Sequence, residues 1–148
     1  MFLTRRAAIA AIALSPALAA AQQPSSGGIA VEQPWMRAAI QGGTGGAFLT
    51  LRNAGTGPDR LLSASSPAAR AVELHTTVRD GDVMRMQPVQ AVEVPAGGNV
   101  TLRPGGMHIM LIGLAEAARP GAMVPLTLQF ERAGAVSVQL AVQAAGAA

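Results

Sequence analysis

Hydrophobic residues along the chain occur in short runs that glycine, proline, asparagine or aspartate interrupt after a few positions. Within many of these runs apolar and polar residues alternate, which is the period-two pattern of a half-buried strand. No long stretch shows the helical spacing. Many short strands with regular turn signals are typical of a sandwich or barrel. The pattern therefore predicts an all-β fold with strands at 29–33, 47–53, 60–65, 71–78, 83–86, 91–94, 99–102, 108–112, 124–130 and 136–142.

The beginning of the chain follows a different pattern. Residues 1–6 include the basic pair Arg5-Arg6, and residues 7–20 are small and apolar, with small residues continuing to Ala21. The apolar run is shorter than the roughly 20 residues that span a bilayer, so it is typical of a signal peptide cleaved after Ala21 rather than of an uncleaved anchor. The pair Arg5-Arg6 also permits twin-arginine export. We predict a signal peptide at 1–21, a flexible linker at 22–28, one β-domain at 29–143 and a disordered tail at 144–148, in a periplasmic protein without a stable membrane span.

One predicted hairpin brings a histidine and a methionine together. Asp80-Gly81 is a favoured dipeptide for a two-residue turn, and a turn centred on it pairs His75 with Met86. Directly opposed residues have Cβ atoms about 4.5–5.5 Å apart. Alternation places His75 on the more polar face of its strand, and Met84 and Met86 share that face. Two thioethers on a polar strand face are unusual for packing alone.

A second predicted strand carries the other histidine of the chain. In the run from Met107 to Leu111, His108 and Met110 point to one face and Met107 points to the opposite, apolar face. Residues two apart on a strand have Cα atoms about 6.6 Å apart, and the Met side chain is long and flexible. A metal ion between His108 and Met110 is therefore within reach of both.

The composition narrows the chemistry of these four side chains. The chain has no cysteine, which excludes disulfides, thiolate zinc sites, iron–sulfur clusters and cysteine-ligated blue copper. Thioether sulfur is soft and neutral and selects Cu(I), and neutral imidazole also binds copper. We expect no Asp or Glu beside the ligands, which argues against hydrolytic metal chemistry. Each residue alone has an ordinary packing or surface explanation, but their conjunction favours a copper carrier over an enzyme.

The charge balance excludes another class of protein. The 11 basic residues are all arginine, and the acidic residues number 8. Two of the arginines lie in the predicted signal peptide, so the remaining chain is close to neutral. A protein that binds nucleic acid through bulk positive charge needs a cluster of Lys or Arg to neutralise phosphates, and this chain has none.

The spacing of the four candidate ligands resembles a known signature. Ten residues separate His75 from Met86, twenty-one residues separate Met86 from His108, and Met110 follows two positions after His108. This pattern is similar to the copper-binding signature of the PCuAC family of periplasmic copper chaperones. Further similar segments are 34–37, 47–53, 72–75, 80–86 and 102–111, so the resemblance covers about residues 29–143. It implies a cupredoxin-like Greek-key β-sandwich or barrel of about 8–10 short strands that carries one Cu(I) per chain. Thr76 departs from the family, in which many members have Met directly after the first histidine.

The resemblance also implies a recipient for the copper. Members of the family supply the dinuclear copper centre of cytochrome c oxidase, often with a thioredoxin-like assembly partner. The expected partners are therefore the copper-bearing oxidase subunit and such an assembly protein. The alternative is a metal-free binding or scaffold module that uses the sheet face near Trp35. Met84 and Met107 are close enough along the chain to serve as alternative ligands, and Met84 is preferred because Met107 is expected to face the core.

Overall fold

The structure, a computed structural model, describes residues 25–146 of the chain, so the predicted signal peptide lies outside the described residues. All regular secondary structure in the described range is β-strand, which confirms the all-β fold predicted from the sequence. No helix in this part of the chain could therefore reach across a bilayer. The strands are β1 (Ser25–Ser26), β2 (Ile29–Arg37), β3 (Thr44–Asn53), β4 (Asp59–Ser65), β5 (Ala69–Asp80), β6 (Val83–Pro88), β7 (Val92–Val94), β8 (Asn99–Leu102), β9 (His108–Leu114), β10 (Met123–Phe130) and β11 (Gly134–Gln143).

The last part of the predicted linker lies within the described residues. Ser25 and Ser26 form β1, which pairs with the start of β2. Residues 22–24 of the predicted linker lie outside the described range. Gly27 and Gly28 both have positive φ, which allows the tight reversal between the two strands.

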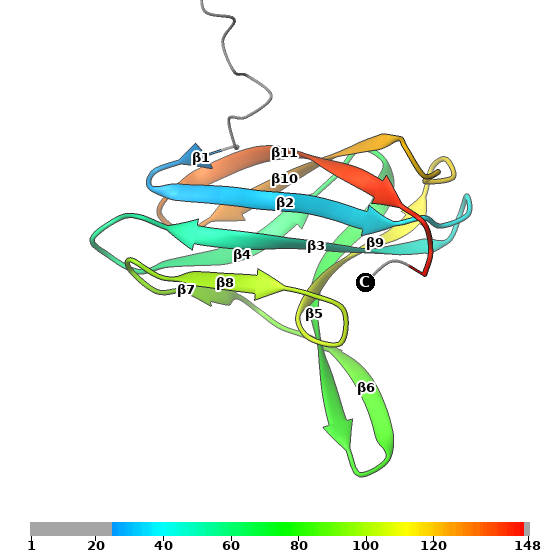
Figure 1. Ribbon diagram of the computed structural model, residues 1–148, viewed down its shortest axis with the longest axis horizontal. Helices are drawn as coiled ribbons and strands as arrows, with labels where there is room; N and C mark the ends of the chain where they lie inside the picture. The colour runs from blue at the N-terminus through cyan, green and yellow to red at the C-terminus, as the bar shows by residue number, and fades with distance from the viewer. Residues whose placement is uncertain (1–24, 147–148) are drawn as a thin grey trace, which may run out of the picture.

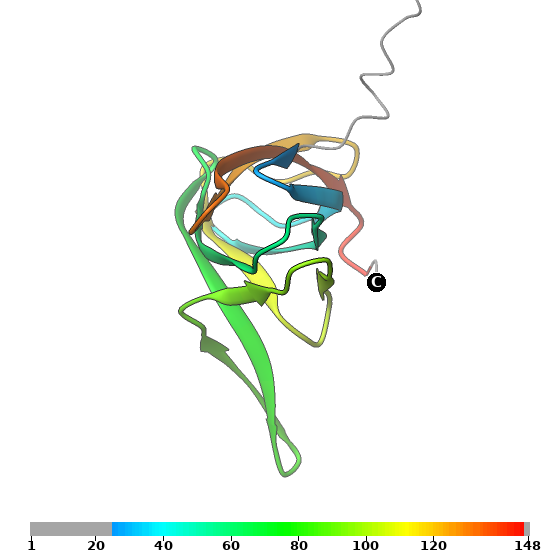
Figure 2. The same ribbon diagram turned by 90° about the vertical axis from the view of Figure 1, so that its left-hand side faces the viewer.

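The strands form one continuous sheet that curls around the core (Figures 1 and 2). The order is β6-β5-β9-β3-β2-β11-β10-β4-β7, and β1 and β8 pair with β2 and β3 outside this path. Neighbours are antiparallel except for β2 and β11, which run parallel. β4 and β5, which are distant in this order, also contact each other, so the sheet closes into a flattened barrel.

The core is built from aliphatic side chains, as the low aromatic content requires. β10 and β11 alternate buried and exposed residues along their lengths, so their apolar sides face inward and their polar sides face solvent. Leu128 and Leu140 are fully buried. Burial of one such side chain contributes about 1.5–3 kcal/mol to the free energy of unfolding. In β10 and β11 this alternation fixes which face points outward.

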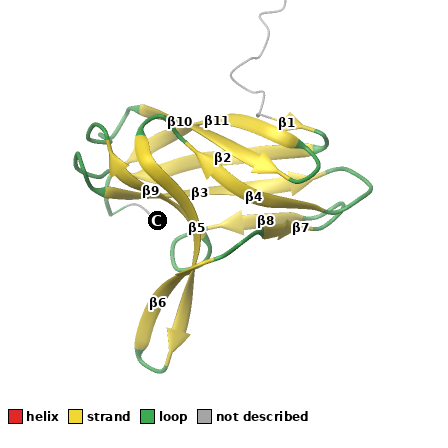
Figure 3. Cartoon of the chain, turned by 180° about the vertical axis from the view of Figure 1, so that it is seen from behind, coloured by secondary structure: helices red, strands yellow, loops and turns green. Residues whose placement is uncertain are grey.

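One hairpin projects from the barrel (Figures 1 and 3). β5 pairs with β9 from Ala69 to His75 and with β6 from His75 to Asp80, so His75 pairs with both strands. All residues of β6 are exposed. We call the hairpin formed by residues 75–88 the arm.

The register of the arm differs from the sequence prediction by two residues. Met86 faces Thr77, and His75 faces Pro88, so the predicted pair of His75 with Met86 is wrong. The central turn residues are Gly81 and Asp82 instead of Asp80 and Gly81. Gly81 has a φ of 65°, and glycine is the residue preferred at the first central position of a type II′ turn. Because the shift is an even number of residues, the predicted faces survive and Met86 still lies on the side of the arm that carries His75.

Candidate metal centre

The two histidines of the chain lie directly opposite each other on neighbouring strands. β5 and β9 pair so that His75 is the register partner of His108. The centres of the two imidazole rings are 6.0 Å apart and the ring planes are inclined by 47°. His108 is only 4% exposed and the side chain of His75 is 17% exposed. A metal–imidazole bond measures about 2.0–2.1 Å, so a single ion is small enough to sit between rings at this separation.

Each imidazole has one nitrogen engaged and one left free. Nδ1 of His108 lies 2.9 Å from the carbonyl oxygen of Gly106, and Nε2 of His75 lies 2.8 Å from Oε2 of Glu73. A carbonyl or carboxylate oxygen only accepts, so these ring nitrogens carry the protons and donate. The remaining lone pairs are on Nε2 of His108 and Nδ1 of His75. Both atoms are buried and have no hydrogen-bond partner.

Two free buried nitrogens on facing rings are costly without a ligand. An unsatisfied buried polar atom costs about 1–3 kcal/mol of stability. In metal sites the same arrangement is common, because a ligating histidine donates its other N–H to a carbonyl or carboxylate that fixes the ring. The hydrogen bonds of His75 and His108 therefore fit a pair of imidazoles that present lone pairs to one cation.

Met110 lies on the same face as His108, two residues further along β9. Its register neighbours are Glu73 on β5 and Gly46 on β3. Gly46 has no side chain, and a Cβ there would lie 3.3 Å from the ring of Phe48. The glycine therefore lets the ring of Phe48 pack closely against the backbone next to Met110.

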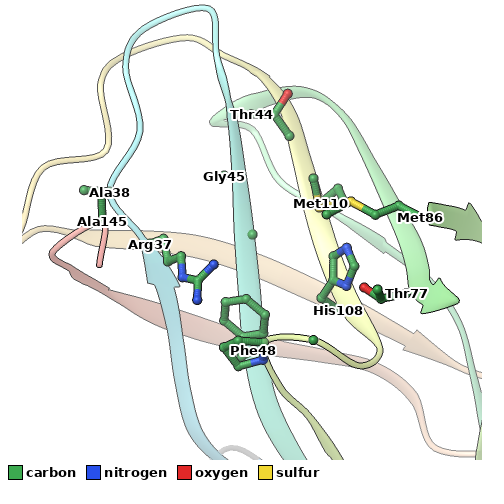
Figure 4. Close-up of a pocket in the computed structure, with 13 residues that line it drawn as sticks. Arg37, Ala38, Thr44, Gly45, Phe48, Thr77, Met86, His108, Met110 and Ala145 are labelled. Atoms are coloured by element: carbon green, nitrogen blue, oxygen red, sulfur yellow. The ribbon is translucent and has the colours of Figure 1, made fainter. Parts of the chain in front are cut away.

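Met86 approaches the same place from the arm. Figure 4 shows the Met86 side chain extending toward Met110, close to His108. The three side chains line one pocket of about 240 Å³, to which Thr77 and Phe48 also contribute. Met86 is 61% exposed, so its thioether is the most accessible of the four candidate side chains.

An aromatic wall closes the site on the side away from the arm. The ring of Phe48 lies 6.4 Å from that of His108, and the indole of Trp35 lies 4.8 Å from Phe48. The Arg37 guanidinium stacks on Phe48 at 5.5 Å. Two of the four aromatic Phe, Tyr and Trp residues of the chain thus gather at this site. Phe48 and Arg37 thus form part of the lining of the pocket that also holds His108.

The structure corrects one expectation about the chemistry of the site. We expected no carboxylate beside the ligands, but Glu73 contacts His75. Glu73 precedes His75 by two residues, so the sequence already placed both on the same strand face.

The two alternative methionines lie in different places. Met84 pairs with Arg79 one step further out on the arm and is 55% exposed. Met107 packs against the core, as predicted. Within residues 25–146 no three His, Asp or Glu side chains gather in a way that could hold a metal ion.

Comparisons with known proteins identify relatives over most of the domain. A family profile described as “Putative lipoprotein LpqE-like” matches residues 29–142. The protein “Putative lipoprotein Lxx21020” of Leifsonia xyli subsp. xyli (strain CTCB07) is 37% identical over 115 residues, which are 76% of this chain and 69% of that protein.

Two similar solved structures contain copper. The “Copper-bound PCuAC domain from PmoF2” is 31% identical with a TM-score of 0.70, over 83% of this chain and 98% of that one. The CuI-DR1885 solution structure from Deinococcus radiodurans is 28% identical with a TM-score of 0.59, over 84% of this chain and 83% of that one.

Proposed function

The chain belongs to the LpqE-like family, and from that premise we propose that it is a metallochaperone that carries one Cu(I) ion outside the cytoplasm. The proposed ligands are two imidazoles and two thioethers, those of His75, Met86, His108 and Met110. The observation that carries the proposal is the pair of buried ring nitrogens without partners, on histidines that face each other beside the methionines. The copper-bound PCuAC domain that this chain resembles supports the same cargo.

The ligand chemistry favours the monovalent ion. Two neutral imidazoles and two neutral thioethers add no charge, and soft sulfur prefers Cu(I) to zinc, magnesium, manganese or calcium. No thiolate is involved, so the set persists in an oxidising compartment where cysteines form disulfides. The proposal therefore combines a cysteine-free chain, export by the predicted signal peptide to the periplasm, and a carrier role instead of catalysis.

The proposed destination of the copper is the dinuclear centre of cytochrome c oxidase, as the resemblance to the PCuAC family implies. The copper-bearing oxidase subunit, a thioredoxin-like assembly protein, or both are the proposed partners. The exposure of Met86 supports a transfer role, because an incoming ligand from a recipient reaches this corner of the site through solvent.

A competition experiment tests the proposal against the alternative of a metal-free scaffold. Purified protein is mixed with Cu(I) and a strong chromophoric chelator, and copper retained by the protein is measured. We expect the native chain to retain one equivalent and the double variant Met86→Leu, Met110→Leu to lose it. Met123→Leu is the matched control, because Met123 is 57% exposed but lies on β10 away from the site. Retention of no copper by the native chain refutes the proposal and leaves the scaffold alternative.

X-ray absorption of the loaded protein then counts the ligands. The proposed set predicts two nitrogen and two sulfur neighbours around copper. A spectrum with nitrogen or oxygen neighbours alone would contradict the role of both methionines.

A further inference from the structure

Resting on the proposed function, we infer that Glu73 is a positioning residue that selects which nitrogen of His75 binds copper. Its carboxylate oxygen Oε2 lies 2.8 Å from Nε2 of His75. Because a carboxylate only accepts hydrogen bonds, this contact places the proton on Nε2 and the lone pair on Nδ1. The ring of His75 is thereby held in one tautomer before any metal arrives.

The two histidines of the site are oriented by different means. A backbone carbonyl, that of Gly106, fixes the Nδ1–H tautomer of His108, whereas a side chain fixes the Nε2–H tautomer of His75. The pair thus presents Nε2 from one ring and Nδ1 from the other. Rotating either ring to present its other nitrogen would break the hydrogen bond that holds it.

Strand geometry explains why Glu73 can do this. Residues 73 and 75 lie on the same face of β5, so the glutamate side chain runs along the strand to reach the imidazole. Glu73 is also the register partner of Met110 on β9, so its carboxylate lies beside the thioether side of the site. Its side chain is 50% exposed, so the carboxylate is reached by solvent while it contacts the imidazole.

The carboxylate also balances the charge of the bound cation. Four neutral ligands leave the full charge of Cu(I) in a site that is closed on one side. A carboxylate that accepts a hydrogen bond from a ligating imidazole makes that imidazole more basic, so it binds the metal more strongly. Loss of such a partner lowers metal affinity about 10–100-fold. We therefore assign Glu73 a contribution to affinity although it does not touch the metal.

Nuclear magnetic resonance tests the tautomer without copper. Long-range proton–nitrogen spectra of the ¹⁵N-labelled, metal-free native chain distinguish the two neutral tautomers of each ring. We expect the two histidines to differ, with the proton on Nε2 of His75 and on Nδ1 of His108. In Glu73→Ala we expect His75 to populate both tautomers and His108 to remain unchanged. A native His75 with its proton on Nδ1, or an unchanged His75 in the variant, overturns the inference.

Copper affinity provides the second measurement. We expect Glu73→Ala to raise the Kd for Cu(I) about 10-fold. Glu73→Gln should recover part of this loss, because its amide oxygen accepts the same hydrogen bond without the charge. Glu93→Ala is the control, since Glu93 is also exposed and ion-paired, with Arg60 on β4, away from the site. If the native chain binds no copper, the proposed function fails while the tautomer result still decides the role of Glu73.

Discussion

The barrel wall and the arm contribute to the same site in opposite ways. The wall, formed by β5, β9 and β3, places His108 at 4% exposure with an engaged Nδ1 and an aromatic neighbour. The arm carries Met86 at 61% exposure on a strand whose residues are all exposed. The first region is fixed by burial and hydrogen bonds, and the second is held by the pairing of β5 with β6 and by one hydrogen bond from the Thr77 N–H to the Gly106 carbonyl.

The difference separates two requirements of a copper carrier. Ligands that are held in place before binding lose little freedom when the ion arrives, and this favours affinity. A ligand on an exposed hairpin can be displaced by an incoming ligand without disturbance of the core. We therefore expect substitutions in the wall to affect copper retention and stability together, and substitutions in the arm to affect copper alone.

The largest effect is expected for His108→Ala. The variant loses a proposed ligand, and we expect the Kd for Cu(I) to rise more than about 100-fold, beyond the cost of losing an outer partner. Truncation of a buried side chain should also lower the free energy of unfolding by about 2 kcal/mol or more. Chelator competition and urea unfolding measure the two effects. If His108→Ala does not fold, His75→Ala takes its place in the copper measurement. It removes the imidazole of His75, which is less buried than that of His108.

A substitution in the barrel remote from the site should affect stability without affecting copper. The carboxylate of Asp59 accepts hydrogen bonds from the backbone N–H groups of Arg60, Arg132 and Ala133. Asp59→Asn removes one accepting oxygen, and an unsatisfied N–H costs about 1–3 kcal/mol. Urea unfolding should show this loss at neutral pH, while the affinity of the folded variant for Cu(I) stays unchanged. A weaker copper affinity would show that strands β5, β9 and β3, which carry the candidate site, are coupled to the barrel around Asp59.

The same residue gives the barrel an acid dependence. Burial alone would raise the pKa of the Asp59 carboxyl, but the backbone N–H donors outweigh it and lower the pKa below the ordinary value of 3.8. A lowered pKa means that this stabilisation is complete above about pH 4 and disappears as the pH falls through the folded-state value. The native chain should therefore lose unfolding free energy in this acid range, and Asp59→Asn should lose less. Urea midpoints measured at a series of pH values check the difference.

A smaller effect on copper is expected for Met86→Leu in the arm. The substitution preserves size but removes one of the four proposed ligands, so we expect the Kd for Cu(I) to rise by at least about 10-fold, the lower limit for loss of a group that only supports a ligand. Stability should change by less than about 0.5 kcal/mol, because the residue is exposed. A loss of stability comparable to that of His108→Ala would contradict the contrast between the arm and the wall.

The smallest effect is expected for Met84→Leu. Met84 lies one step further out on the same face of the arm and pairs with Arg79. We expect its substitution to change the Kd for Cu(I) by less than about 2-fold, within the scatter of a neutral surface substitution. Comparison with Met86→Leu in the same chelator assay decides which arm thioether is the ligand. A larger loss for Met84 would move the proposed ligand outward along the arm.

Much of the fold follows from the sequence because local signals determine it. Turn residues separate the strands, and alternation fixes which side faces the core, so Ile109 and Leu111 are buried while His108 and Met110 share the opposite face. The register of the arm could not be predicted from the sequence. Asp80-Gly81 and Gly81-Asp82 overlap, and both suit a two-residue turn. The sequence alone does not choose between two such adjacent turns.

The contacts within the site required the three-dimensional structure. Alternation placed Glu73 and His75 on one face, yet only the pairing of β5 with β9 shows that the imidazole of His75 meets His108. The aromatic wall is a further example, because Phe48 and Trp35 belong to strands far from the histidines in the sequence and reach the site through the order β5-β9-β3-β2. Long-range strand order is the information that local patterns lack.

The continuity of β5 has a mechanical consequence. One unbroken strand is part of the barrel before His75 and part of the projecting hairpin after it. A protein that binds the hairpin would therefore act on the same strand that carries His75, a proposed copper ligand. If copper passes to a recipient that docks there, we expect docking and loosening of the ion to be coupled.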